Sequence, residues 1–114
     1  MSKREWKRFI EDILESIGLI ESYIQNMELS DFSKDRKTID ALVRNFEIIG
    51  KASKFIPDDI KIEHAEIDWK GIIGLRNRIA HEYFGISSPI VWDSIKKELP
   101  RLKNQMTLIL PCMG

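Results

Sequence analysis

One short stretch of the chain, GLRNRIAHEYFG at residues 74–85, concentrates the side chains that could do chemistry. It holds a guanidinium at Arg76, a carboxamide at Asn77, an imidazole at His81 and a phenol at Tyr83. Arginine offers a planar fork of donors to phosphate oxygens, and histidine titrates near neutrality and can move protons. Cleavage of RNA without a metal needs a base for the 2′-hydroxyl, an acid for the leaving oxygen and a cation for the charged transition state. The stretch therefore predicts a site that handles phosphodiesters.

The helical phase of this stretch distinguishes its two arginines. We expect a helix over residues 69–84, with Asp68 as its N-cap. At about 100° per residue, Arg76 falls in the middle of an apolar stripe, whereas Arg78 points away from it, beside Glu82 one turn later. The stripe consists of Trp69, Ile72, Ile73, Ala80 and Phe84. Arg76 should therefore face an interior or an interface, where an unpaired charge is costly, and Arg78 should lie on the surface.

Asn77 and His81 lie one turn apart on the flank of that stripe, and Tyr83 returns to a position almost above Arg76. The four side chains can therefore border one concavity. The single histidine of the motif fills one proton-transfer role, so a second group could come from a symmetric partner chain. The spacing alone leaves a structural role open, in which Arg76 makes a buried ion pair and His81 is a satisfied core histidine.

Apolar residues recur at three- and four-residue steps along most of the chain, which predicts an all-α bundle of four main helices plus a short helical turn. The main helices are expected at residues 5–27, 33–55, 69–84 and from 89 onward. Ser30 and Asp31 mark the first break, and Pro57 opens the short turn. Ser88 should cap the last helix, and Pro100 should kink or split it.

The helix expected at residues 33–55 is apolar on two nearly opposite sides. One side carries Ile39, Leu42, Val43, Phe46 and Ile49, and the other carries Ala41, Ile48, Ala52 and Phe55. A charged band of Asp40, Arg44, Glu47 and Lys51 lies between them. A helix that is apolar on two sides must be covered on both. Its second cover is either a second subunit, which would form a homodimer, or another helix of the same chain.

The length of 114 residues fits a single domain that spans residues 1–114. The net charge is zero, with 18 basic and 18 acidic residues, which argues against general coating of nucleic acid but leaves room for a locally basic cleft. No apolar run is long enough to span a membrane, and the start, MSKREWKRF, lacks the features of a signal peptide. With one cysteine and therefore no intrachain disulfide, we expect a cytoplasmic protein.

The remaining candidates for chemistry are weaker. His64 lies in KIEHAEI, a charged stretch typical of a surface, and is interpreted as a bystander. Cys112 has no partner of the type that a nucleophile needs. No cluster of Cys and His suggests zinc, and no glycine-rich loop suggests a nucleotide phosphate site. We therefore expect neither a metal nor a cofactor.

RNRIAHEYFGI resembles the Arg-x4-His-x-Tyr signature of HepT-like toxins in the HEPN superfamily. ALVRNFEIIGKASKFIP resembles their second helix, and DWKGIIGLRNRIAHEYFGI followed by IVWDSIKKELPRLK resembles their third and fourth. The resemblance covers residues 5–108. It implies a homodimeric HEPN-like bundle whose two motifs meet in a composite cleft. It also implies a metal-independent endoribonuclease that acts on RNA as the toxin of a type VII toxin–antitoxin system.

The resemblance further implies a role for each residue of the motif. Arg76 and His81 are the catalytic pair, Asn77 assists them, and Tyr83 is the AMPylation site. The antitoxin is a minimal nucleotidyltransferase of the MntA type, which silences the toxin by adding AMP to that tyrosine. Phosphate groups attached at Tyr83 would occupy the phosphate site and repel RNA.

One departure from the family concerns the second helix. Where the family often has Gly-Glu-Ala, this chain has Gly50-Lys51-Ala52, which would change the charge of the cleft. Two alternatives to a nuclease stay open. The chain could be a non-catalytic module that binds a nucleotide or a nucleotidyltransferase, or a plain helical dimer whose motif is structural.

Overall fold

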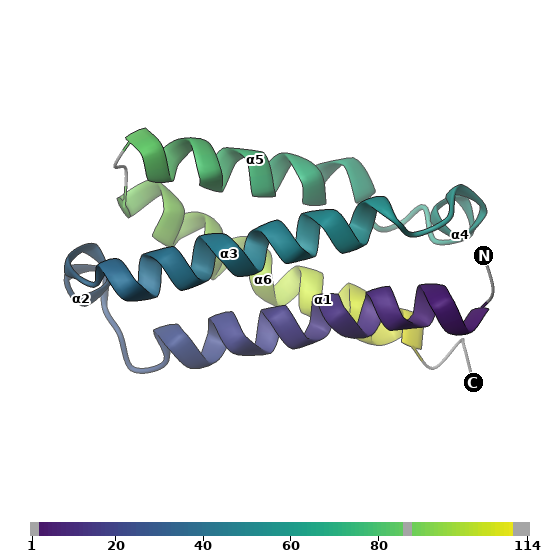
Figure 1. The fold of residues 1–114 in the computed structure, drawn as a ribbon, viewed down its shortest axis with the longest axis horizontal. Helices are drawn as coiled ribbons and strands as arrows, with labels where there is room; N and C mark the ends of the chain where they lie inside the picture. The colour runs from purple at the N-terminus through teal and green to yellow at the C-terminus, as the bar shows by residue number, and fades with distance from the viewer. Residues whose placement is uncertain (1–2, 86–87, 111–114) are drawn as a thin grey trace.

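In the computed structural model, four long helices run up and down along the molecule, and two short helices lie at its opposite ends (Figure 1). The structure describes residues 3–85 and 88–110, with side chains for 5–79 and 89–110. The helices are α1 (Lys3–Ile24), α2 (Leu29–Lys34), α3 (Arg36–Lys54), α4 (Asp58–Glu63), α5 (Trp69–Gly85) and α6 (Ser88–Ile109). The described residues contain no strand, which confirms the predicted all-α bundle.

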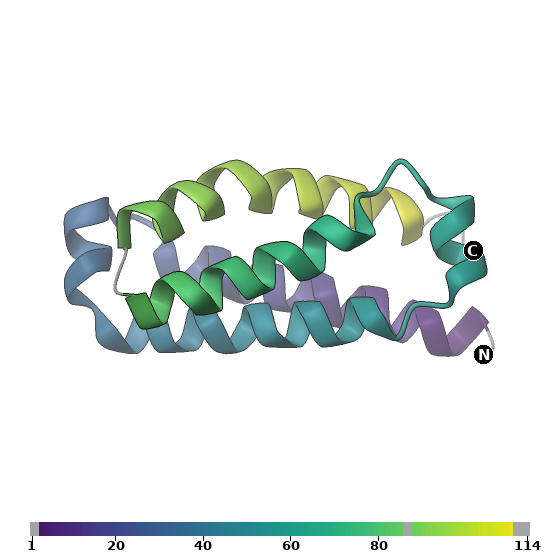
Figure 2. The same cartoon turned by 90° about the horizontal axis from the view of Figure 1, so that it is seen from above.

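The helices converge on one apolar core. In Figure 1, α3 lies between α1 and α5, and Figure 2 shows α6 on the far side of the bundle. The large side chains that are fully buried include Ile10, Ile13, Ile17, Ile20, Phe32, Leu42, Phe46, Ile49, Ile56, Ile79, Ile95 and Met106. Each stabilises the fold by roughly 1.5–3 kcal/mol relative to an exposed position. None of the described helices is long and apolar enough to cross a membrane.

The connection from α1 to α3 differs from the prediction, which places a simple break at Ser30 and Asp31. Here α1 ends earlier, and Asn26 adopts a left-handed backbone with φ of 65°, which asparagine tolerates better than most residues. Asp31 belongs to α2, where its Oδ2 accepts the backbone N–H of Glu28 at 2.9 Å. Phe32 anchors this short helix, since it is fully buried with its ring 5.0 Å from that of Trp92. Helix α2 is therefore an addition to the prediction, whereas α4 confirms the short helical turn expected after Pro57.

The caps of the next helices explain where they begin. The helix expected from residue 33 begins at Arg36, because Asp35 caps it: Oδ1 of Asp35 accepts the backbone N–H of Thr38 at 3.1 Å. Pro57 stands at the N-cap of α4 and not in its first turn. The predicted N-cap of α5 is confirmed, since Asp68 Oδ1 accepts the backbone N–H of Gly71 at 2.9 Å.

Pro100 lies inside α6, and the helix is unbroken from Ser88 to Ile109, so of the two predicted alternatives, a kink or a split, the split does not occur. Figure 2 shows α6 as one arched ribbon. Pro100 is exposed, so the Lys96 carbonyl that loses its helical N–H partner can turn to water. Ile95 and Leu99, just before Pro100, and Leu102, just after it, are buried and hold both halves of the helix on the core.

Candidate functional site

Arg76 reaches from α5 to its neighbour α3. Its Nη2 lies 3.1 Å from Oε2 of Glu47, and its Nη1 donates to Oδ1 of Asn77 at 2.7 Å. Gly50 makes this approach possible, because a Cβ there would stand 3.0 Å from Cγ of Arg76. A carboxylate, an amide and the packing of its aliphatic stem therefore all orient the Arg76 guanidinium.

The prediction that Arg76 occupies the middle of a buried stripe is wrong. The buried residues of α5 include Leu75 and Ile79 besides Trp69 and Ile72, and they turn the centre of the stripe away from Arg76. The Arg76 side chain is 34% exposed and lies at the edge of the stripe. At an edge the guanidinium keeps part of its hydration, so its burial costs less and its donors stay accessible to a ligand.

A hollow of about 370 Å³ opens between α3 and α5 beside the Arg76 guanidinium. It is lined by Arg44, Glu47, Ile48, Gly50, Lys51, Lys54, Ile73 and Arg76. Four of these eight residues are cations and one is an acid. The acid, Glu47, already pairs with Arg76, and no acid of the described chain forms an ion pair with the other three cations. The hollow therefore carries an excess of positive charge in a chain whose net charge is zero.

His81 and Tyr83 follow on the same helix, because α5 runs without a break to Gly85. Asn77 is exposed and lies one turn before His81, whereas Tyr83 stands two turns past Arg76 at nearly the same phase. The side chains of His81 and Tyr83 lie outside the described residues. Their predicted place beside the guanidinium stays a prediction.

The other arginine of the motif behaves as expected. Arg78 is exposed, which confirms its prediction as a surface residue, and its predicted partner Glu82 lies outside the described side chains. Arg78 borders a separate, smaller hollow of about 150 Å³ between α5 and α6, beside Glu98 and Arg101. The two arginines therefore lie on different faces of α5.

His64 lies just after α4 and does not line the hollow between α3 and α5. Its backbone carbonyl accepts the indole N–H of Trp69 at 3.1 Å, and its Nδ1 lies 3.5 Å from Oε1 of Glu66. Its side chain is only 14% exposed, so it packs more closely than the charged sequence around it suggests. Cys112 lies outside the described residues. Among the described side chains, no three of His, Cys, Asp or Glu gather closely enough to hold a metal ion.

The motif alone does not reveal the half of the site that α3 supplies. The sequence does show Arg44, Glu47 and Lys51 as a charged band, but it does not show that this band faces the arginine of α5. The usable signal is Gly50, a glycine inside a helix at the point where another helix brings a long side chain close.

The up-and-down bundle, with Arg-x4-His-x-Tyr on its third long helix, defines an all-α HEPN-like domain. The family described as ribonuclease HepT-like matches residues 13–109, nearly the whole bundle. The chain therefore belongs to the ribonuclease HepT-like family, as the resemblance of its motif predicts.

Relatives from several organisms match the chain over almost its full length. A "Probable ribonuclease HepT" of Thermococcus cleftensis is 42% identical over 103 residues, which cover 90% of this chain and 94% of the relative. A candidate RNase of Methanocaldococcus jannaschii is 34% identical over 109 residues, covering 96% and 100%. Another, from Caldanaerobacter subterraneus subsp. tengcongensis, is 37% identical over 102 residues, covering 90% and 91%. No solved structure matches the chain.

Proposed function

We propose that this protein is an endoribonuclease that acts as the toxin of a HepT/MntA-like toxin–antitoxin system in the cytoplasm. The observation that carries the proposal is the Arg76 guanidinium, which Glu47 and Asn77 orient at the edge of a basic hollow. A guanidinium in this setting suits a phosphodiester, because it can bind two phosphate oxygens at once. The names of the relatives, which are called ribonucleases, support the same reaction.

In the proposed reaction, the 2′-hydroxyl of a ribose attacks the adjacent phosphorus. The new O2′–P bond gives a cyclic phosphate, and the P–O5′ bond breaks. His81 transfers a proton, either from the 2′-hydroxyl or to the leaving O5′, and Arg76 stabilises the charge that builds up on the phosphoryl oxygens. The chain's own residues supply these roles, so the proposed reaction needs no metal.

The second proton-transfer group would come from a second copy of the chain. Ile48 and Phe55, from the second apolar stripe of α3, are 37% and 48% exposed. Phe55 stacks on Phe9 of α1 with ring centroids 5.4 Å apart, so α1 covers only part of it. Ile48 also lines the hollow beside Arg76. A homodimer that covers this stripe would bring the two motifs toward one composite cleft.

Regulation would act on Tyr83. A minimal nucleotidyltransferase antitoxin would transfer AMP from ATP to the phenol oxygen of Tyr83, which loses its proton, and the bond between the α- and β-phosphates would break to release pyrophosphate. The added phosphate would compete with RNA for Arg76, which lies two turns away on the same helix. The intact mass of protein co-expressed with such an enzyme should rise by whole AMP groups that map to Tyr83.

Cleavage of RNA by the purified, unmodified protein in the presence of EDTA tests the proposal. Arg76→Ala and His81→Ala should abolish cleavage and growth arrest, with helical content retained. Arg78→Ala is the matched control, because Arg78 is an exposed arginine on the same helix, and it should cleave at the wild-type rate. A His81→Ala protein that still cleaves RNA would refute the proposal. Binding of a nucleotide without any cleavage would instead favour a non-catalytic module.

A further inference from the structure

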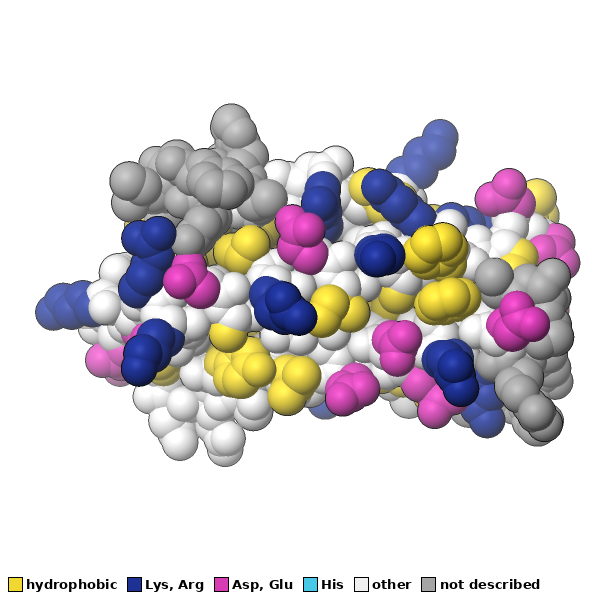
Figure 3. All heavy atoms as spheres, viewed as in Figure 1, with side chains coloured by type: hydrophobic (Ala, Val, Ile, Leu, Met, Phe, Trp, Pro, Cys, Tyr) yellow, Lys and Arg dark blue, Asp and Glu magenta, His cyan; other side chains and the backbone are white. Residues whose placement is uncertain are grey.

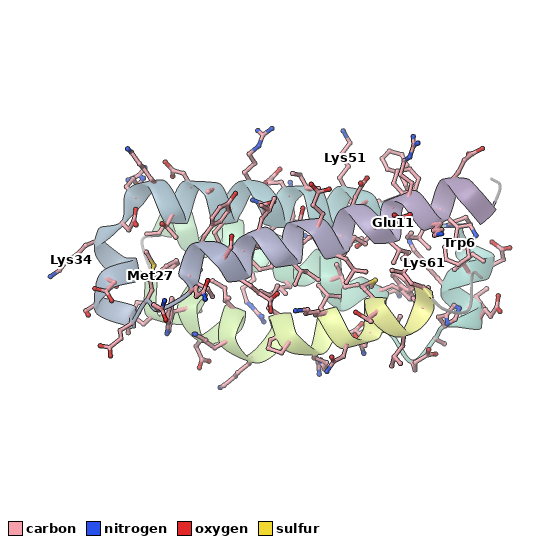
Figure 4. The ribbon with its side chains drawn as sticks, turned by 90° about the horizontal axis from the view of Figure 1, so that it is seen from below. Trp6, Glu11, Met27, Lys34, Lys51 and Lys61 are labelled. Carbon is pink, nitrogen blue, oxygen red and sulfur yellow. The ribbon has the colours of Figure 1, made fainter. Side chains whose placement is uncertain are left out.

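The basic residues that α3 brings to the hollow share one side of that helix. Arg44 and Lys51 are two turns apart and lie almost in line, and Lys54 is nearly one turn further on, turned toward α5. Figure 4 shows Lys51 standing out from the α3 ribbon, away from the core. Figure 3 shows Lys and Arg side chains spread over this face, next to hydrophobic ones. We define Arg44, Lys51 and Lys54 as the α3 row.

We propose that the α3 row binds the phosphates that flank the scissile bond, so that Arg76 acts on one phosphodiester while α3 holds its neighbours. The inference rests on the proposed function, and it assigns substrate-positioning roles to residues outside the motif. Arg44 and Lys54 are about 15 Å apart along the helix axis. A row of that length can contact more than one phosphate of an extended strand.

The charges around the row favour a polyanion as its ligand. Arg44, Lys51 and Lys54 form no ion pair with an acid in the described parts of the chain. Glu47 is the sole acid among the residues that line the hollow, and it pairs with Arg76. A phosphate chain that lies along the row would place an anionic group near each cation and release counterions from the RNA.

The apolar part of the hollow's lining is compatible with a strand of RNA that the protein binds through its phosphate backbone. Ile73 of α5 also lines the hollow and offers an apolar surface to a ribose or a base face. The lysines of the row are long and flexible point charges, which suit phosphates but carry little sequence information. The row should therefore strengthen binding about equally for different RNA sequences.

Salt dependence of RNA binding tests the inference. The His81→Ala protein is titrated against a fluorescently labelled single-stranded RNA, and Kd is measured by anisotropy at several KCl concentrations. Lys51→Gln, Arg44→Gln and Lys54→Gln are each added to that background. Each should make the slope of the logarithm of the association constant against log [KCl] less negative by about 0.7, the value for one phosphate contact on a single strand. The triple variant should lose about 2.

Lys97→Gln is the matched control. Lys97 is a lysine of α6 whose side chain is 71% exposed and pairs with Asp93 at 3.0 Å, so its removal should leave the slope unchanged. Slopes for the row variants that equal the control's would overturn the inference. So would row variants that lose the dimer in sedimentation but keep the slope, because the row would then contact a second copy and not RNA.

The same proteins with His81 restored separate this inference from the proposed function. Active row variants should show a raised KM and an unchanged kcat, as expected when binding is lost equally in the ground and transition states. If the row variants cleave RNA with the salt dependence and the KM of the wild type, the α3 row does not bind RNA, but the proposed nuclease activity stands. If the row variants reduce the salt dependence of RNA binding but the wild-type protein does not cleave RNA, the row binds nucleic acid and the proposed nuclease activity is refuted.

Discussion

Gly50→Ala tests whether the close packing of Gly50 against Arg76 is needed for activity, separately from its effect on the stability of the fold. An added Cβ would stand 3.0 Å from Cγ of Arg76, 3.3 Å from its Cβ and 3.4 Å from its Cδ. Gly50 does not have a positive φ, so alanine fits its backbone. The substitution therefore adds no backbone strain, and its effect on the site comes from the contact with Arg76. To relieve that contact, the Arg76 stem must shift by a few tenths of an ångström, which disturbs its 3.1 Å contact with Glu47.

Two opposing effects set the change in stability. Alanine in place of glycine inside a helix stabilises by about 0.8–1 kcal/mol. Overpacking of a tight contact costs about 1–3 kcal/mol. We therefore expect the free energy of unfolding of Gly50→Ala to change little or to fall by up to about 2 kcal/mol. Cleavage should fall several-fold, by up to about tenfold, because a 1 Å misplacement in a catalytic site can cost about a hundredfold and the expected shift is a few tenths of an ångström.

Gly18→Ala is the matched control, since Gly18 is exposed inside α1 and an added Cβ would meet no atom within 4 Å. It should gain about 1 kcal/mol, which raises Tm by roughly 4 °C, and should leave cleavage unchanged. Thermal unfolding followed by circular dichroism and single-turnover RNA cleavage give the two readouts. A Gly50→Ala protein as stabilised as Gly18→Ala and fully active would refute the proposed coupling between Gly50 and Arg76.

Three further changes test other parts of the structure. Hydrogen bonds from the backbone N–H of Thr38, and secondarily from its hydroxyl, lower the pKa of Asp35 below its usual 3.8. The stability that ionised Asp35 supplies is therefore complete above pH 3.8, and it is lost as the pH falls through the lowered pKa. The Tm gap between wild type and Asp35→Ala should therefore close in acid, and a gap that stays constant down to pH 2 would contradict this. Gly71→Ala should not show the gain of about 1 kcal/mol in the free energy of unfolding that is expected for Gly18→Ala, because its Cβ would collide with the capping carboxylate of Asp68; a Tm raised as far as that of Gly18→Ala would disprove the collision. Phe55→Asp should give a folded monomer in sedimentation that no longer cleaves RNA, and a fully active dimer would rule out this interface.

The sequence predicts most of the fold because its local signals agree with the packing. The apolar residues of α1, such as Ile10, Ile13 and Ile17, recur at helical steps, and all three are fully buried. Asp68 predicts the start of α5 because capping depends on a few adjacent atoms. The short helix α2 escapes prediction because its stability comes from the burial of Phe32 against Trp92, a contact between distant parts of the chain.

The candidate site is only half predictable for the same reason. Spacing within the motif places Arg76, Asn77 and His81 on one helix, but the direction of the buried stripe depends on what packs against it. Leu75 and Ile79 face the core, and this turns Arg76 to an edge where it meets Glu47. That partner lies on another helix, and no periodicity within α5 could identify it.

The zero net charge of the chain gives little information about binding to RNA. At physiological ionic strength, charges separated by more than about 8 Å are largely screened, so a phosphate in the hollow responds mainly to the charges that line it, which are Arg76, the α3 row and Glu47. Helix α6 lies on the other side of the bundle from α3 (Figure 2), and its two acids, Asp93 and Glu98, already pair with Lys97 and Arg101. Local sorting of charge, not its sum, therefore decides whether the hollow attracts a polyanion. By this reasoning a change of charge at Lys97 should leave RNA affinity intact, whereas the same change at Lys51 should weaken it.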